Sequence, residues 1–316
     1  MKIVILDGRA LNPGDLSYDA VNPFGDVTLY QHTDSPEEAI ARIGDSQIVL
    51  TNKVPITRQI LEACPNIQLI CVLATGYNIV DVDACREKGI PVCNVPSYGT
   101  AAVAQFTLAL MLEICHRIGH HDRVVHDGKW CACPNFCFWD TPQMELGGKT
   151  LGIIGYGRIG QAVAKLAEAF GMRVLAYSRT PKPELANFVD MNTLLAQSDF
   201  VSLHCPQFPE TTKMVNAEFL GKMKDGAVLI NTSRGGLVDE QALCDALVSG
   251  KLSAAAVDVV SAEPMKADNP LLDAPNCIIT PHIAWAPKES RQRLLDCVVE
   301  NIRAFLENNP QNVVNF

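Results

Sequence analysis

Three polar residues in the second half of the chain could do chemistry together. Arg234, Glu263 and His282 each come shortly after a run of apolar residues typical of a buried strand. Arginine binds a carboxylate through two parallel hydrogen bonds. Histidine transfers a proton near neutral pH, and a neighbouring carboxylate orients its ring. Because open α/β sheets bind ligands at the carboxyl ends of their strands, we expect a site that holds a carboxylic acid and moves a proton.

Each of these residues also has an ordinary interpretation when taken alone. His282 could be a core or capping histidine, Glu263 a loop acid, and Arg234 half of a surface ion pair. Their occurrence at three successive strand ends favours the functional interpretation.

A glycine-rich turn lies upstream, at Gly155, Gly157 and Gly160, between an apolar strand and a helix. The first glycine permits a tight turn, the second lets backbone amides approach a pyrophosphate, and the third lets helix and strand pack closely. The N-terminus of the helix adds partial positive charge. Strand, turn and helix together predict a dinucleotide site rather than a turn without ligand.

The residues after the next predicted strand bear on which dinucleotide binds. Where an acid commonly accepts hydrogen bonds from the ribose of NAD, this sequence has Ser178, followed by Arg179. Arginine suits the 2′-phosphate of NADP, and Lys182 adds positive charge nearby. We therefore expect NADP(H) to be preferred. The alternative is a solvated Arg179 and a site that also accepts NAD(H).

Short β-branched runs alternate with helical segments along the chain, which predicts an α/β fold. A long apolar helix from Ser97 toward Gly119 should be buried. The strands expected before it are Lys2–Leu6, Gln47–Leu50, Gln68–Val72 and Pro91–Asn94, with helices at Pro55–Ala63 and Asp81–Lys88.

After this helix the alternation is more regular and predicts a doubly wound parallel sheet. A last amphipathic helix, from about Lys288 to Glu307, has no strand left to cover there, so we expect it to fold back across the first domain. The strands expected in the second sheet are Thr150–Gly155, Arg173–Tyr177, Phe200–His204, Ala227–Asn231, Ala254–Val257 and Cys277–Thr280, with helices such as Ile159–Phe170 and Glu240–Val248.

The 316 residues are enough for two domains, and the net charge is −9. Nucleic-acid binding requires a concentrated basic surface, so this charge argues against such a partner. No apolar run reaches the ~20 residues that span a bilayer, and the first apolar run is too short for a signal sequence. We expect a cytoplasmic protein without membrane contact. Of the twelve cysteines, Cys71, Cys205, Cys244 and Cys297 lie in apolar stretches where a free thiol acts as a small hydrophobic residue, which fits a reduced protein.

Two groups of residues have the types but not the spacing of metal ligands. Cys131, Cys133 and Cys137 lack a second cysteine pair or a histidine pair at zinc-finger spacing. His116 and His120 are expected four residues apart on one helix face, but there is no His-Glu-x-x-His arrangement. We expect no metal site, ordinary thiols, and histidines that are solvated or interdomain.

The order of these motifs resembles the D-isomer-specific 2-hydroxyacid dehydrogenase family over essentially the whole chain. The likeness is closest to its hydroxypyruvate reductase (glycerate dehydrogenase) and glyoxylate reductase branch. It rests on residues 231–236 with 238–240, on 258–264 and on 280–285. The resemblance implies two Rossmann-like domains. A doubly wound NAD(P)-binding domain, 99–285, would be inserted into a flavodoxin-like substrate domain formed by 1–98 and 286–316.

The resemblance also implies a reaction, in which NAD(P)H reduces a small 2-keto acid, hydroxypyruvate or glyoxylate, to the D-2-hydroxy acid. His282 would protonate the developing alkoxide, Glu263 would stabilise the imidazolium, and Arg234 would anchor the carboxylate and polarise the carbonyl. The amides of Thr75 and Gly76 would bind the other side of that carboxylate, as the two domains close over the substrate. The implied cofactor contacts are Gly155, Gly157, Arg158, Ile159, Gly160, Ser178, Arg179, Thr180, His204, Cys205, Pro206, Thr232, Ser233, Asp258, His282 and Ala284.

Several features separate this chain from the commonest family pattern. Trp285 stands in place of a small residue, Val260 in place of an aromatic residue, and Gln105 where an acid is common. Trp285 leaves the size of the accepted substrate open. The segment Trp130–Trp139 is more apolar than a solvated loop, which predicts a homodimer, as is common in the family.

Other functions on this scaffold remain as alternatives, and the sequence does not fix which 2-keto acid is physiological. Phosphoglycerate, phosphonate or formate oxidation uses the same architecture. A phosphorylated substrate would require more basic residues near the substrate loop than Lys53 and Arg58, and the end of the chain at Phe316 leaves no room for an appended regulatory domain. A dinucleotide-sensing corepressor would not need all three catalytic side chains and would usually carry peptide-docking additions.

Overall fold

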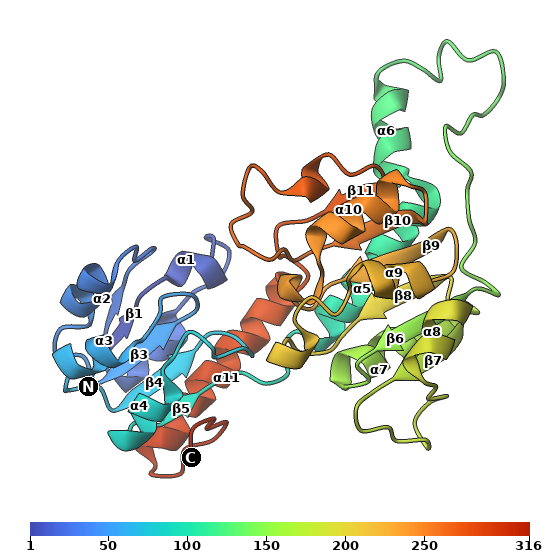
Figure 1. Cartoon of the computed structure of the whole chain (residues 1–316). Helices are drawn as coiled ribbons and strands as arrows, with labels where there is room; N and C mark the ends of the chain where they lie inside the picture. Colours follow the sequence, from blue (N-terminus) through green and yellow to red (C-terminus); the bar gives the residue numbers. More distant parts are fainter. The chain divides into compact units, whose positions relative to one another are not determined.

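The computed structural model describes residues 1–316, and the chain divides into two compact units. Unit 1 consists of Met1–Gly99 and Trp285–Phe316, and unit 2 consists of Thr100–Ala284 (Figure 1). The chain thus leaves unit 1 after Gly99 and returns at Trp285. The sequence predicted changes of domain after residues 98 and 285, and the units change after residues 99 and 284.

Unit 1 is built on a five-stranded parallel sheet with the order β2-β1-β3-β4-β5. Strand β2 was not expected from the sequence. It is an edge strand whose residues are mostly exposed, so it lacks the apolar run that marks its neighbours. The strands are β1 (Lys2–Ile5), β2 (Asp26–Leu29), β3 (Ile48–Thr51), β4 (Leu69–Val72) and β5 (Val92–Cys93).

Alternate residues of these strands face opposite sides of the sheet, and helices cover both sides. Val4 and Val49 pack with α2, α3 and α4, whereas Ile3 and Ile48 pack with the long helix α11. Figure 1 shows α11 running beside β4 and β5. The helices of unit 1 are α1 (Gly8–Leu11), the 3-10 helix η1 (Asp19–Phe24), α2 (Pro36–Ile43), α3 (Arg58–Ala63), α4 (Val82–Glu87) and α11 (Lys288–Leu306).

Unit 2 is built on a six-stranded parallel sheet with the order β11-β10-β9-β8-β6-β7. The strand order reverses at β6, which has β7 on one side and β8 on the other. Ligands bind α/β sheets at such a reversal, outside the carboxyl ends of the strands. The two parallel sheets confirm the α/β fold expected from the sequence. The strands are β6 (Thr150–Ile154), β7 (Arg173–Tyr177), β8 (Phe200–Leu203), β9 (Ala227–Asn231), β10 (Leu252–Val257) and β11 (Cys277–Ile279).

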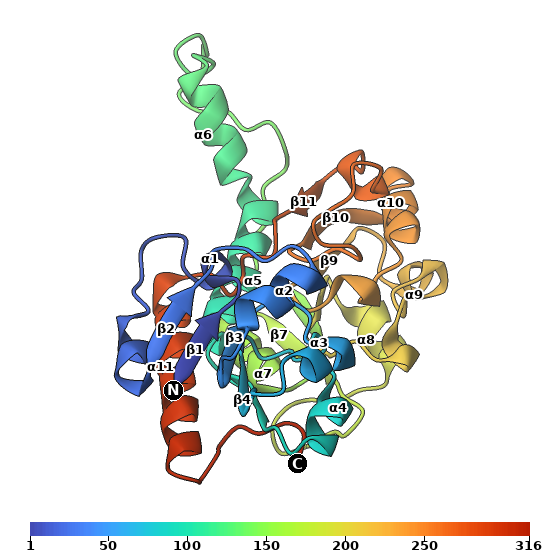
Figure 2. The same ribbon diagram turned by 90° about the vertical axis from the view of Figure 1, so that its left-hand side faces the viewer.

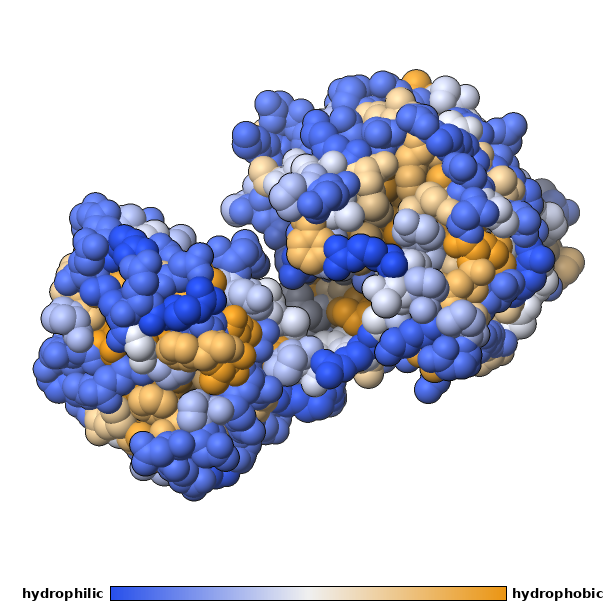
Figure 3. Space-filling view, turned by 60° about the horizontal axis from the view of Figure 1, so that its bottom comes forward, coloured by the Kyte–Doolittle hydropathy of each residue, from blue (hydrophilic) through white to orange (hydrophobic).

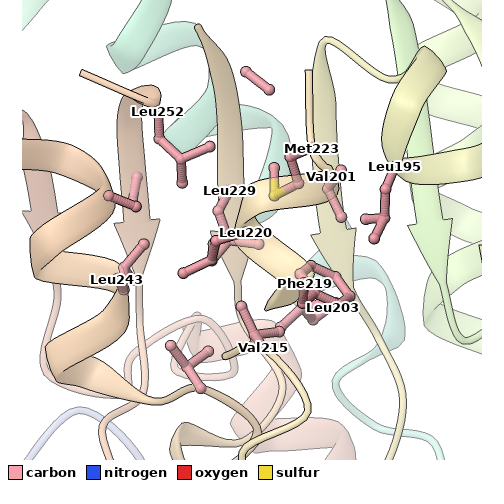
Figure 4. Close-up of a cluster of buried hydrophobic side chains, with 14 of the residues drawn as sticks. Leu195, Val201, Leu203, Val215, Phe219, Leu220, Met223, Leu229, Leu243 and Leu252 are labelled. Carbon is pink, nitrogen blue, oxygen red and sulfur yellow. The ribbon is translucent and has the colours of Figure 1, made fainter. Parts of the chain in front are cut away.

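Helices also cover both faces of this second sheet. Figure 4 shows one of its two cores, in which Val201 and Leu229 of the sheet lie among side chains from α8, α9 and α10. On the other face, α5 and α7 pack against the sheet through Met111 and Val163. Hydrophilic residues cover most of the surface presented in Figure 3. The helices of unit 2 are α5 (Thr100–His116), α6 (Ile118–His126), α7 (Arg158–Ala169), α8 (Met191–Gln197), α9 (Ala217–Lys222) and α10 (Glu240–Val248), with 3-10 helices η2 (Pro209–Thr211), η3 (Gly235–Leu237) and η4 (Pro270–Leu272).

The long helix expected from Ser97 toward Gly119 is wrong in its extent. It begins at Thr100 and ends at His116, because Arg117 has a left-handed backbone conformation with φ of 49°. Helix α6 begins directly after this residue. No single helix has the length and hydropathy of a membrane span, although α5 and α6 taken together as a bent pair have the required length and hydropathy. In Figures 1 and 2, α6 and the segment after it extend away from the sheet of unit 2.

Candidate active site

The glycine-rich turn follows β6 at the point where the strand order reverses. Gly155 has φ of +97°, and a Cβ there would lie 2.5 Å from the Cys205 amide nitrogen. A Cβ on Gly160 would lie 2.3 Å from the Gly155 carbonyl oxygen. Glycine is therefore required at both positions by close backbone packing.

Gly157 differs from the other two glycines because a Cβ there would meet nothing within 4 Å. It is the N-cap of α7, and no side chain caps this helix. The open space therefore lies in front of the positive end of a twelve-residue helix whose first residues are Arg158 and Ile159. These features fit the pyrophosphate of a dinucleotide.

Ser178, Arg179 and Thr180 follow the neighbouring strand β7. The Ser178 hydroxyl lies 3.3 Å from the Thr180 amide nitrogen, which donates to it. The Arg179 guanidinium lies 5.8 Å from the centre of the Phe208 ring. No acidic residue occurs between Ser178 and Lys182, so the end of β7 presents hydroxyl and cationic groups.

His204, Cys205 and Pro206 follow β8 on the other side of the reversal. The Ser202 hydroxyl lies 2.8 Å from His204 Nε2, and burial lowers the pKa of His204 to about 4. The ring is therefore neutral at ordinary pH. Burial also raises the pKa of the Cys205 thiol, so Cys205 is not a thiolate nucleophile.

The loop after β9 carries Thr232, Ser233 and Arg234. Asn231 holds this loop: its side-chain amide donates to the Arg234 carbonyl at 2.9 Å, and its oxygen accepts from the Ser233 amide at 3.1 Å. The Thr232 hydroxyl lies 3.0 Å from that of Thr107 on α5. Arg234 is exposed, and its Nη1 donates to the Ser233 carbonyl at 2.7 Å.

Asp258, at the end of β10, is buried and holds the loop that carries His282. Its carboxylate accepts hydrogen bonds from the Thr280 hydroxyl at 2.6 Å, the Ile283 amide at 2.9 Å and the Ala284 amide at 2.8 Å. Its carbonyl accepts from the His282 amide at 2.8 Å. These bonds keep His282 in a left-handed conformation, φ of 55°, which is unusual for a residue other than glycine.

The structure brings Glu263 and His282 together. Oε2 of Glu263 lies 2.7 Å from Nδ1 of His282, and the two side chains are partly exposed. When the carboxylate is ionised, Nδ1–H donates to it and the proton-transferring role falls to Nε2. Arg234, Glu263 and His282 thus come from the carboxyl ends of β9, β10 and β11, which are consecutive strands of the sheet (Figure 1).

Thr75 and Gly76 belong to unit 1, where they follow β4. The Thr75 hydroxyl donates to the Val95 carbonyl at 2.7 Å, and the Asn94 side chain donates to the Thr75 carbonyl at 2.7 Å. These bonds fix the loop, so its backbone amides have a defined position at the carboxyl edge of the sheet.

Sequence reasoning missed Asp7, which organises a second loop at the same edge of unit 1. Its buried carboxylate accepts from the amides of Asn52 at 2.8 Å and Lys53 at 2.6 Å, and burial raises its pKa. An acid directly after the first apolar strand was the available signal. Lys53 is thereby held where β3 ends.

Comparison with known proteins identifies the family. The model of the NAD-binding domain of D-isomer specific 2-hydroxyacid dehydrogenases matches residues 108–284. The chain is 58% identical to a hydroxypyruvate reductase from Blautia hydrogenotrophica, with 100% of both chains covered. This chain belongs to the D-isomer specific 2-hydroxyacid dehydrogenase family. It is therefore an NAD(P)-dependent oxidoreductase with a dinucleotide-binding domain.

Further relatives agree with this membership. The dehydrogenase is 43% identical to a glycerate dehydrogenase from Methylorubrum extorquens, covering 99% of this chain and 98% of the other. The solved structure of an acyclic imino acid reductase in complex with NADPH and D-Arg is 31% identical and has a TM-score of 0.88. That match covers 99% of this chain and 100% of the other, so the two-sheet fold is shared along the full length.

The remaining candidate residues lie elsewhere in the dehydrogenase. The expectation that His116 and His120 share one helix face is wrong: the break at Arg117 puts them on separate helices, and His120 pairs with Asp140 at 2.8 Å. No group of three or more His, Cys, Asp or Glu residues is arranged to hold a metal ion. The Trp285 ring packs edge-on against Tyr98, with ring centres 6.4 Å apart, beside the core that α11 covers.

Proposed function

We propose that this dehydrogenase reduces small 2-keto acids, hydroxypyruvate and glyoxylate first among them, to 2-hydroxy acids, of the D configuration where the product is chiral, with NADPH as the preferred cofactor. The observation that carries the proposal is the Glu263–His282 pair at 2.7 Å, an acid–base unit at the end of neighbouring strands. The substrate choice is supported by two relatives named hydroxypyruvate reductase and glycerate dehydrogenase, which are names for opposite directions of one reaction.

His282 is the proposed proton donor. When bound, the dinucleotide supplies the hydride for the keto carbon. His282 gives its Nε2 proton to the substrate oxygen as charge develops there, while the Glu263 carboxylate at Nδ1 stabilises the protonated ring. The oxidation direction reverses the transfer, with neutral His282 taking the proton.

Arg234 is the proposed carboxylate anchor. Its exposed guanidinium can bind the substrate carboxylate bidentately and polarise the adjacent carbonyl. We also assign carboxylate binding to the backbone amides of Thr75 and Gly76 in unit 1, supported by the fixed loop after β4. Backbone donors held in this way stabilise negative charge without reorganising.

The preference for NADP(H) is supported by the residues after β7. An adenosine 2′-phosphate at the end of β7 would meet the Ser178 hydroxyl and the Arg179 guanidinium, and residues 178–182 include no acid. The full set of proposed cofactor contacts is Gly155, Gly157, Arg158, Ile159, Gly160, Ser178, Arg179, Thr180, His204, Cys205, Pro206, Thr232, Ser233, Asp258, His282 and Ala284.

Steady-state kinetics with purified protein test both parts of the proposal. We expect kcat/KM to be highest for hydroxypyruvate in a panel with glyoxylate, pyruvate and phosphohydroxypyruvate, and higher with NADPH than with NADH. Faster reduction of phosphohydroxypyruvate would favour the phosphoglycerate alternative. Absence of turnover with every 2-keto acid would favour a dinucleotide-sensing binding protein.

The proposal includes a homodimer and a cytoplasmic location. In the segment after α6, Trp130, Phe136 and Trp139 are 52%, 89% and 65% exposed, and a partner subunit would remove this apolar area from water. Light scattering that gave a particle of one chain mass, 34.4 kDa, would contradict the dimer. All twelve cysteines are free thiols, which supports a reducing compartment; fractionation of cells tests this.

A further inference from the structure

The carboxylate of Glu263 is held on both sides. Oε2 pairs with His282 Nδ1 at 2.7 Å, and Oε1 accepts from the Val260 amide at 3.3 Å. The direction in which Glu263 presents its carboxylate to His282 therefore depends on where the Val260–Ser261 turn lies. This turn follows β10 and is not part of any helix or strand.

Glu240 holds this turn from the neighbouring helix. The Ser261 amide donates to Glu240 Oε1 at 2.7 Å, and the Ser261 hydroxyl donates to Oε2 at 2.8 Å. Both carboxylate oxygens of Glu240 are thus used by one residue of the turn. Hydrogen bonds to an ionised carboxylate are about twice as strong as neutral ones.

Glu240 is itself fixed. It is the first residue of α10, where the Asp239 side chain caps the helix, and α10 buries Leu243 and Leu247 in the core of unit 2. Glu240 thus belongs to a helix that is packed into a core, whereas the Ser261 that it holds is exposed.

The turn is also packed against the loop of Arg234. A Cβ on Gly235 would lie 1.9 Å from the Val260 carbonyl carbon and 2.0 Å from its oxygen, so the two backbones are in direct contact. The turn that Glu240 holds is therefore also in contact with the loop of Arg234, the residue proposed to bind the substrate carboxylate.

We propose that Glu240 is a positioning residue for the reaction: by holding Ser261 it fixes the Val260–Ser261 turn and so aims the Glu263 carboxylate at His282. The inference rests on the proposed function, in which Glu263 and His282 form the acid–base unit. The competing explanation is that Glu240 only stabilises the N-terminus of α10 as an acid in the first turn. That role would affect the stability of the fold and leave catalysis unchanged.

Glu240→Ala, Glu240→Gln and Ser261→Ala separate these explanations, with Gln241→Ala as the matched control on the same helical turn. We expect Glu240→Ala to lower kcat by about tenfold or more, because a misplaced acid–base group loses orientation. Its Kd for NADPH, followed by fluorescence, should stay within about twofold of the wild-type value, a spread of roughly 0.4 kcal/mol. Glu240→Gln should recover part of kcat, because the amide oxygen still accepts one of the two hydrogen bonds. Ser261→Ala should lower kcat about two- to tenfold.

The decisive measurement is non-additivity with Glu263→Gln. If Glu240 acts through Glu263, Glu240→Ala should cause little further loss of single-turnover rate when Glu263→Gln is already present. An equal loss in both backgrounds, or a wild-type kcat in Glu240→Ala, overturns the inference. Should Glu240→Ala fail to fold, the same cycle with Ser261→Ala decides. If Glu263→Gln itself leaves kcat unchanged, the proposed function has failed instead.

Discussion

Nδ1 of His282 lies 2.7 Å from Oε2 of Glu263, and Asp258 fixes the backbone on the other side of the histidine through four hydrogen bonds. The imidazole is thus oriented from its ring and from its main chain at once. The left-handed φ of His282 persists because these contacts determine it. Such restraint aims Nε2 in one direction, which a general acid requires.

Replacing His282 tests this arrangement most directly. His282→Ala should lower kcat for hydroxypyruvate at least ~100-fold, since general acid–base groups contribute a factor of that size or more. NADPH binding, measured by fluorescence titration, should persist in weakened form, because His282→Ala removes one proposed cofactor contact and leaves the glycine-rich turn and the residues after β7 in place. Near-wild-type turnover in this variant would contradict the role of His282.

The glycines of the dinucleotide turn should respond differently to alanine. At Gly155 the positive φ and a contact of 2.5 Å to the backbone of Cys205 leave no room for a Cβ. Gly155→Ala should therefore lower the free energy of unfolding by more than ~2 kcal/mol. Denaturant unfolding, compared with the wild type, measures this loss.

Gly157→Ala should leave stability nearly unchanged, because the new methyl group meets no protein atom within 4 Å and φ is −79°. That methyl group would occupy the space in front of α7, so the Kd for NADPH should rise at least ~10-fold, or about 1.4 kcal/mol. An unchanged Kd in a folded Gly157→Ala protein would show that the pyrophosphate binds elsewhere.

The strand ends that carry Arg234, Glu263 and His282 could be located from the sequence, because buried parallel strands are apolar runs and polar residues stand out at their ends. The hydrogen bond from the Ser261 amide to Glu240 could not be predicted from the sequence. The two residues are 21 positions apart, and a backbone amide selects no particular partner type because any acceptor side chain can pair with it. Most of the fold was predictable for the same reason, but strand β2, helix α2 and the break between α5 and α6 were not predicted. Strand β2 lies at an edge and is mostly exposed, and the helix break at Arg117 follows no glycine or proline.

Cofactor preference should shift when Ser178 becomes acidic. An aspartate there would accept hydrogen bonds from a ribose hydroxyl and repel a 2′-phosphate. Ser178→Asp should therefore lower kcat/KM for NADPH at least ~10-fold, which corresponds to a loss of about 1.4 kcal/mol of transition-state stabilisation. The kcat/KM for NADH should stay equal or rise. Ser178→Ala is the control for loss of the hydroxyl alone. A parallel loss with both cofactors in Ser178→Asp would indicate damage to the loop rather than altered selectivity.

His204 should make stability depend on pH in a defined window. Its pKa in the folded chain is about 4, whereas that of a solvated histidine is about 6.5. Between these values the unfolded chain binds a proton that the folded chain does not, so the folded state loses stability as pH falls through this range. Well above pH 6.5 His204 is neutral in both states and contributes nothing to the dependence.

Within the pH range between these two pKa values, His204 should change the free energy of unfolding by about 1.4 kcal/mol per pH unit. In urea unfolding at pH 7.5 and pH 5.0, His204→Gln should reduce the difference between the two free energies of unfolding by about 2 kcal/mol. A glutamine amide can still pair with the Ser202 hydroxyl, which preserves the local contact. His32→Gln, at an exposed position, should leave the difference unchanged. Equal pH dependence in wild type and His204→Gln would mean that the ring is hydrated and titrates normally in the folded protein.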